Sequence, residues 1–260
     1  MDGGEVCELL YRDDYLVAVN KPAGLLVHRS PIDRHETRFA LQQVRDQLGQ
    51  HVYPVHRLDK PTSGVLLFAL SSEVARLLST QFANGAVRKE YLAVVRGFCP
   101  SEGTIDYPLK RELDRIADRD RCLDKAAQSA LTRFARLGIV ELPIAVERYP
   151  QTRYSLVQLW PHSGRKHQLR RHMKHIGYPI IGDAKHGKGV HNRFFQRAYD
   201  CRRLLLACTG VALTHPVSGA QVSVQATLDT AFDMVLVALG WDNCVPQALR
   251  HGAGTLATEA

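Results

Sequence analysis

Residues 56–70, HRLDKPTSGVLLFAL, join a charged turn to an apolar run. The run over residues 65–70 has no polar side chain, which is typical of a strand buried on both faces of a sheet. The Thr62-Ser63-Gly64 turn before it permits a sharp bend, because glycine tolerates a positive φ. The stretch therefore predicts a central strand with a rigid loop at its mouth, from which Asp59 projects.

Asp59 lies between two cations, Arg57 and Lys60. Neighbouring positive charges keep a carboxylate ionised. An ionised aspartate can act as a salt-bridge partner, a general base or a nucleophile. From this stretch alone, a loop aspartate bound to its own backbone or to Arg57 explains the sequence as well as a catalytic carboxylate does.

Around this stretch, strands and helices do not alternate regularly. Extended segments are predicted at residues 6–11, 15–20, 24–28, 52–58, 88–97, 152–160 and 204–213. Helices are predicted at 38–49, from Ser71 or Ser72 to Asn84, within 163–177 and at 230–241. This mixture predicts an α+β fold with a mostly antiparallel, mixed central sheet and flanking helices. Residues 183–201 are polar and basic and predict a long surface loop, and residues 110–125 predict a solvated loop or exposed helix.

The 260 residues allow one large domain, which we place at residues 1–242, with a flexible tail at 243–260 because that end lacks periodicity. With 45% hydrophobic and 23% charged residues, the composition is that of a globular protein rather than a disordered one. The acidic N-terminal segment is unlike a signal peptide, and no apolar run approaches the roughly 20 residues of a membrane span. We therefore expect a cytoplasmic protein without a membrane partner.

The six cysteines are scattered and include no C-x-x-C pair. Their spacing argues against a disulfide framework and against a cysteine zinc site. The formal net charge of +8 favours a polyanionic partner, most commonly a nucleic acid.

A second group of polar residues, SGRKHQLRRHMKH at 163–175, concentrates positive charge. Such like charges repel one another, so an anion is the natural partner, either a phosphate backbone, an internal carboxylate or both. The three histidines of this stretch do not match H-E-x-x-H, and no acid lies among them, so no metal site is predicted. Tyr91, in RKEYLAV, lies beside Lys89 and suits stacking on a flipped base, although a tyrosine packed in the core is the simpler interpretation of that residue alone.

Together these segments resemble the RluA family of pseudouridine synthases. VNKPAGLLVH (19–28), HRLDKPTSGVLLFAL, RKEYLAVVRG (88–97), SGRKHQLRRHM and YPIIGD (178–183) occur in the family's order and spacing, over most of residues 15–215. Tyr178 departs from the pattern, since many members have histidine there. The resemblance implies the pseudouridine synthase fold, a catalytic domain without the S4 RNA-binding domain of some relatives, and no cofactor or metal. It is strongest with members that act on tRNA, and it implies the uridine at tRNA position 65, in the acceptor/T-stem region, as the target of a monomer with no obligate protein partner.

The resemblance also implies roles for individual residues. Asp59 would be the nucleophilic carboxylate acting on a flipped-out base, by attack at the sugar C1′, by assisting formation of a glycal, or by attack at uracil C6. Arg170 would be its ion-pair partner, and Tyr91 would stack on the uracil. Arg57 would fill the vacated stack. Phosphate contacts are expected from the remaining basic side chains of the motifs: Lys21, Lys60, Lys89, Arg165, Lys166 and Arg171.

Three alternatives are open at this point. The first is a pseudouridine synthase that acts on ribosomal RNA, since relatives differ mainly in their target. The second is a non-catalytic RNA-binding protein on the same scaffold, which would need the basic surface but not Asp59. The third is a hydrolytic glycosylase, which would release free uracil.

Overall fold

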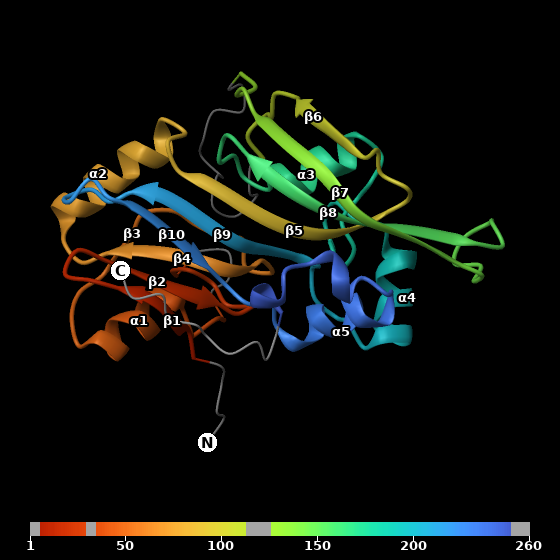
Figure 1. Cartoon of the computed structure of the whole chain (residues 1–260), viewed down its shortest axis with the longest axis horizontal. Helices are drawn as coiled ribbons and strands as arrows, with labels where there is room; N and C mark the ends of the chain where they lie inside the picture. Colours follow the sequence, from red (N-terminus) through yellow and green to blue (C-terminus); the bar gives the residue numbers. More distant parts are fainter. Residues whose placement is uncertain (1–5, 30–34, 113–125, 251–260) are drawn as a thin grey trace.

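The computed structural model describes residues 6–29, 35–112 and 126–250, and its strands form one twisted mixed sheet (Figure 1). The strand order is β1-β2-β4-β9-β5-β8-β7-β6, while β10 pairs with β9 and β3 with β4. Among the described strands the β4–β9 pair alone is parallel. The strands are β1 (Glu8–Arg12), β2 (Leu16–Lys21), β3 (Tyr53–Pro54), β4 (Ser63–Ala69), β5 (Arg88–Arg96), β6 (Glu102–Asp106), β7 (Leu131–Leu142), β8 (Thr152–Pro161), β9 (Leu206–Thr214) and β10 (Gln221–Gln225).

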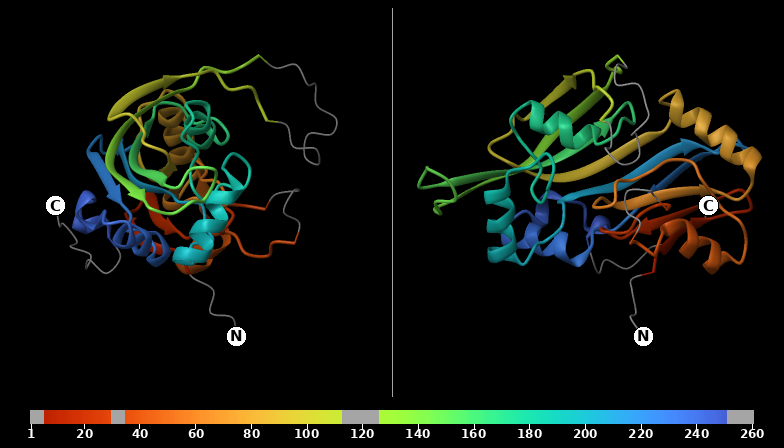
Figure 2. Two further views of the ribbon diagram at one scale, coloured as in Figure 1. Left: turned by 90° about the vertical axis from the view of Figure 1, so that its right-hand side faces the viewer. Right: turned by 180° about the vertical axis from the view of Figure 1, so that it is seen from behind.

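Helices cover both faces of this sheet (Figures 1 and 2). They are α1 (Ala40–Leu48), α2 (Ser72–Ala83), α3 (Gln168–His175), α4 (Gly189–Tyr199) and α5 (Thr230–Ala238), followed by short 3₁₀ turns at Asp242–Cys244 and Gln247–Leu249. The predicted α+β fold with a mostly antiparallel sheet is confirmed. None of the helices in the described ranges is both long and apolar enough to cross a membrane.

The segments nearest the opening stretch form for the predicted reasons. All seven residues of β4 are buried, as expected for a central strand. Helix α2 begins where the Ser71 hydroxyl accepts a hydrogen bond from the Val74 N–H, and α1 ends at Gly49, which adopts the left-handed conformation. Turn chemistry therefore fixes the ends of both helices.

Alternate side chains of β5 enter two different cores. Leu92 and Val94 pack in one cluster with residues of α4 and α5, whereas Ala93 and Val95 pack in another with Leu169 of α3. The two views of Figure 2 place α3 on the face opposite α4 and α5. Strand β5 is thus held on both faces, which makes it a rigid support for side chains at its ends.

The expectation of a long loop at residues 183–201 is wrong, because α4 occupies its second half. His191 and Phe195, one helical turn apart, are both buried, and the Tyr199 ring packs on Phe195. The apolar stripe of this helix is narrow and is surrounded by basic side chains, which concealed its period. Of the stretch 110–125, residues 113–125 lie outside the described part of the chain.

The expected tail differs from the structure over residues 243–250. These residues include the second 3₁₀ turn, where Leu249 is buried, and Arg250 forms an ion pair with Asp233 of α5 at 2.7 Å. Residues 251–260 lie outside the described ranges. The five described cysteines are free thiols, as the scattered spacing predicts, and Cys122 lies outside the described part.

Candidate active site

The Asp59 loop is joined to the rest of the sheet through Gly64. This glycine has φ +107°, and a β-carbon built on it would overlap the backbone carbonyl of Cys208. Gly64 pairs with Cys208 of β9, and Cys208 pairs in turn with Tyr91 of β5. Since only glycine permits this close approach, one backbone position fixes the register between the Asp59 loop and Tyr91.

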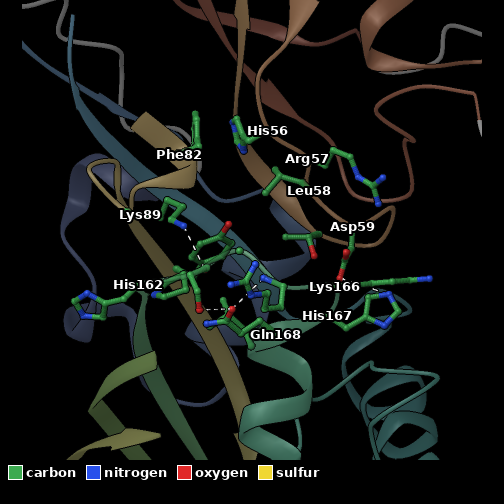
Figure 3. Close-up of a pocket in the computed structure, with 18 of the residues that line it drawn as sticks. His56, Arg57, Leu58, Asp59, Phe82, Lys89, His162, Lys166, His167 and Gln168 are labelled. Carbon is green, nitrogen blue, oxygen red and sulfur yellow. Dashed lines mark hydrogen bonds and ion pairs between the residues drawn. The ribbon is translucent and has the colours of Figure 1, made fainter. Parts of the chain in front are cut away.

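Asp59 and Arg170, far apart in the sequence, meet at one side of a cavity of about 650 Å³. Arg170 donates a hydrogen bond from Nη1 to Asp59 Oδ2 at 3.1 Å. The Arg170 side chain is 7% exposed, while that of Asp59 is 27% exposed. The guanidinium is therefore buried, and the carboxylate that it holds is open to the cavity. Figure 3 shows Asp59 and His167 facing one another at this wall.

Arg170 is held in turn by a second carboxylate that the sequence analysis did not assign. Its Nε and Nη2 donate to the two oxygens of Asp183 at 2.7 and 2.8 Å, and the Asp183 side chain has no exposed surface. Burial acts to raise the pKa of Asp183, but the Arg170 hydrogen bonds and charge outweigh it and hold this pKa below its ordinary value. Asp183 thus fixes the guanidinium in place. The signal in the sequence is the acid that follows the apolar run PIIG.

Tyr91 lies in the wall of the same cavity, at the point where β5 faces the Asp59 loop. Burial, together with the charge and hydrogen bond of Cys208, raises its pKa well above the ordinary value of a tyrosine. The phenol is therefore neutral at physiological pH. A neutral, half-buried ring is suited to stacking on an uncharged base and is unsuited to accepting a proton.

Gln168, at the first turn of α3, shapes the opposite wall of the cavity. Its Oε1 accepts hydrogen bonds from Ser163 Oγ at 2.8 Å and from the Arg165 N–H at 3.0 Å. Its Nε2 donates to the Leu131 carbonyl and to Thr132 Oγ1, both at 3.0 Å. The side chain therefore ties the turn before α3 to β7 and directs the helix toward Asp59.

The structure separates the basic residues expected to contact RNA into four groups. Arg57, Arg165 and Lys166 are exposed and line the cavity, where Figure 3 shows Arg57 pointing away from Asp59. Lys89 lies inside, and burial lowers its pKa while its Nζ donates to the Ser163 carbonyl at 3.4 Å. Its ammonium therefore lies in the cavity wall and not on the exposed surface.

Two further residues of that set engage the protein itself. Lys60 forms an ion pair with Glu36 at 2.8 Å. Arg171 donates to the Lys110 carbonyl at 2.9 Å and lies 3.7 Å from a Glu112 oxygen. The anion expected near the basic motif is therefore in part an internal carboxylate.

The expectation that Lys21 contacts a phosphate is wrong. Lys21 is 0% exposed, and its Nζ donates to the carbonyls of Pro22, Leu25 and Lys60 at 2.8, 2.7 and 3.2 Å. Burial lowers its pKa to about 7. Because the Lys60 carbonyl follows Asp59 directly, Lys21 anchors the aspartate loop from behind and is inaccessible to RNA.

Comparison with known proteins agrees with this geometry. The model of the family described as RNA pseudouridylate synthase matches residues 15–175. The chain belongs to the RNA pseudouridylate synthase family. The match includes Asp59, Tyr91 and Arg170, and every residue that lines the cavity except Leu206. The predicted pseudouridine synthase is thus confirmed at family level.

Individual relatives of this pseudouridylate synthase cover nearly its whole length. The tRNA pseudouridine synthase C of Pasteurella multocida is 56% identical over 90% of this chain and 97% of its own length. The tRNA pseudouridine synthase C of Vibrio cholerae is 52% identical over 90% of this chain and 96% of its own. Among solved structures, the human RNA pseudouridylate synthase domain containing 1 superposes with a TM-score of 0.67 at 26% identity, covering 94% of this chain and 90% of that one.

Proposed function

We propose that this pseudouridine synthase isomerises a uridine of tRNA, at position 65 in the acceptor/T-stem region, with Asp59 as the nucleophile. The observation behind the proposal is the ion pair between Asp59 and the buried Arg170, which opens onto a cavity large enough for a nucleotide. Further support comes from the names of its relatives, tRNA pseudouridine synthase C, and from the surplus of basic residues.

The reaction moves a base without adding or removing atoms. The bond from uracil N1 to C1′ breaks, the uracil turns, and a bond from C5 to C1′ forms while the C5 proton is lost and N1 gains one. Since the net change is an isomerisation, it needs no redox or energy-carrying cofactor. The proposal further describes a cytoplasmic monomer with one catalytic domain, which includes the packed residues 243–250 and requires only its own side chains.

Each side chain has a physical task in this scheme. Arg170 holds the Asp59 carboxylate in a fixed position at the cavity, so the carboxylate can attack C1′ or assist departure of the uracil. Tyr91 stacks on the uracil while it turns. Flipping the nucleotide out of a stem costs a few kcal/mol. The planar guanidinium of Arg57, exposed at the cavity, can compensate part of this cost by filling the gap in the stack.

The decisive experiment compares the wild type with Asp59→Asn on an unmodified tRNA transcript. Because the amide cannot act as a nucleophile, pseudouridine formation should fall by at least about 10⁴-fold while binding of the transcript changes little. Full activity of Asp59→Asn would contradict the assigned role. Loss of binding and activity together would leave the fold of the variant to be checked by its thermal unfolding.

Mapping pseudouridines in cells with and without the gene distinguishes the other candidates. Loss of the modification at tRNA position 65 supports the proposal, whereas loss at a ribosomal position identifies the alternative target. Release of free uracil from the transcript would indicate a glycosylase, and an unchanged map would indicate a non-catalytic RNA-binding protein.

A further inference from the structure

The Glu112 carboxylate lies in a cluster of nitrogen-bearing side chains beside the active site. Its oxygens are 2.6 Å from Lys185 Nζ, 3.2 Å from His167 Nδ1, 3.6 Å from His186 Nε2 and 3.7 Å from Arg171 Nε. Glu112 is 20% exposed and Lys185 is 52% exposed, so the cluster opens to solvent. One small anion is thus surrounded by four nitrogen-bearing side chains from two segments of the chain, and the two imidazoles also hydrogen-bond to each other, His167 Nδ1 to His186 Nε2, at 3.1 Å.

A single imidazole ring separates this cluster from Asp59. His167 Nδ1 faces Glu112, and its Nε2 lies 3.9 Å from Asp59 Oδ2. His167 lines the cavity wall (Figure 3), whereas the other members of the cluster lie outside the cavity. A nucleotide whose base enters the cavity leaves its sugar and phosphate at the mouth. The cluster is therefore next to the place where the backbone of the RNA must pass.

Two kinds of ligand could match these side chains. Glu112, His167 and His186 place one donor atom each within 4.8 Å of one another, and two histidines with a glutamate can hold zinc. However, Lys185 and Arg171 contact the same carboxylate, and Arg170 lies close behind His167. Lys185 and Arg171 place positive charges on the one carboxylate that a metal would need, which disfavours a divalent cation and suits an anion in the place of Glu112. The chemistry favours an anion.

The charges around the cluster are already balanced. Arg170, Arg171 and Lys185 face the carboxylates of Asp59, Asp183 and Glu112. Burial lowers the pKa of both His167 and His186, so neither adds a positive charge at neutral pH. A further anion would leave the cluster with a net negative charge. A phosphate is accommodated only where it replaces a carboxylate, and Glu112 is the one of these three acids that does not bind the Arg170 guanidinium.

We infer that the Glu112 carboxylate occupies a phosphate-binding site and that a backbone phosphate of the RNA, next to the flipped nucleotide, replaces it. This inference rests on the proposed function, since it takes RNA as the substrate. Lys185, Arg171, His167 and His186 then become phosphate ligands. Glu112 acts as an internal competitor that keeps the site closed to other anions until the nucleotide enters the cavity.

The test measures binding of an unmodified tRNA transcript to the full chain over a series of salt concentrations. Glu112→Gln keeps the shape of the side chain and removes the competing charge, so the transcript should bind roughly fivefold more tightly. In the wild type, the phosphate releases a counterion when it binds, but the displaced Glu112 carboxylate takes one up. The net number of ions released at this site is therefore close to zero. The variant should therefore show a salt dependence steeper by about 0.9 in the double-logarithmic plot.

Glu73→Gln is the matched control. It changes the net charge equally, but Glu73 lies exposed in the first turn of α2 and forms no ion pair with any residue that the structure describes. It should reproduce neither the affinity gain nor the steeper slope. Lys185→Met should weaken binding, because it removes the most exposed phosphate ligand. Equal behaviour of the two glutamine variants, or weaker binding by Glu112→Gln, would overturn the inference.

A second measurement does not depend on the RNA. Inorganic phosphate titrated into Glu112→Gln should shift the imidazole NMR signals of His167 and His186, and should leave those of the wild type unchanged. Absence of a shift in the variant contradicts the phosphate site even where tRNA is modified normally. Conversely, a shift without pseudouridine in tRNA contradicts the proposed function and leaves the anion site standing, so the two failures are distinguishable.

Discussion

Two cavities of similar size lie at opposite ends of β5, β8 and α3, and each places an arginine beside a carboxylate. The first, of about 650 Å³, contains Asp59 and Arg170. The second, of about 610 Å³, lies at the base of the β7–β8 hairpin, where Arg96 Nη2 is 2.6 Å from Glu147. Size and ion pairing therefore do not distinguish the active site from the other hollow.

The difference lies in what holds each arginine. Arg170 is clamped by the fully buried Asp183, so the guanidinium is fixed before it meets Asp59. Arg96 is 30% exposed and donates from Nε to His191 at 3.0 Å, while Glu147 is shared with Lys188. The buried Asp183 fixes the position of the Arg170 guanidinium, so this guanidinium stays in place when the Asp59 side chain moves. The ion pair with Asp59 is therefore preorganised.

The largest contrast is expected between two glycines, Gly64 at the end of the Asp59 loop and Gly97 in the wall of the second cavity. Gly64→Ala places a β-carbon on the backbone of Cys208, which cannot move away, and should cost at least about 4 kcal/mol of unfolding free energy. Gly97→Ala has a similar positive φ, but its β-carbon lies 3.2 Å from the Tyr178 ring, which can turn aside. It should cost about 1–2 kcal/mol.

Urea unfolding of both variants measures this difference. If Gly64→Ala does not accumulate as folded protein while Gly97→Ala folds, the cost at Gly64 is at least as large as predicted. Equal costs would mean that the β4–β9 junction yields more readily than its backbone contacts indicate, and would remove the argument that one glycine sets the register of Asp59 against Tyr91.

A smaller contrast is expected between the arginines. Lysine keeps the charge but cannot bind Asp183 through two nitrogens while reaching Asp59 with a third. Arg170→Lys should therefore lower the single-turnover rate of pseudouridine formation by about 10²-fold with little change in tRNA affinity. Arg96→Lys should leave the rate within about twofold of the wild type. Similar losses in both variants would show that the second cavity also takes part in the reaction.

The parts of this site that the sequence predicts are those with a short-range cause. Asp59 between two cations, the positive φ of Gly64 and the capped helix α2 all follow from neighbouring residues. The partnership of Asp59 with Arg170 came from the order of motifs in the family and was then found as a contact. Local pattern alone did not choose between a loop aspartate and a catalytic one.

The parts that the sequence misses depend on burial of polar groups. Lys21 looks like a surface cation in the motif, yet the sheet buries it completely and its ammonium is satisfied by three carbonyls. Asp183 was quoted within a motif without a role, because its function depends on a guanidinium that lies 13 residues earlier and folds onto it. Helix α4 was not predicted because its buried face consists of only His191 and Phe195, which is too few residues to show a helical period. Local hydropathy marks Asp183 only as an acid after an apolar run, and it does not report the buried partners on which these features depend.

The smallest effect concerns what anchors the Asp59 loop, and it depends on pH. Burial lowers the pKa of Lys21 from the ordinary 10.5 to about 7, so between these values the unfolded chain binds more protons than the folded one. The free energy of unfolding should therefore rise with pH across this window, by up to about 1.4 kcal/mol per unit. Lys21→Met removes the titrating group, so the stability advantage of the wild type over the variant should grow between pH 7 and pH 9. Urea midpoints of both proteins at each pH measure that advantage, and a difference that stays constant would mean that Lys21 is not held as a buried, readily deprotonated amine behind the aspartate.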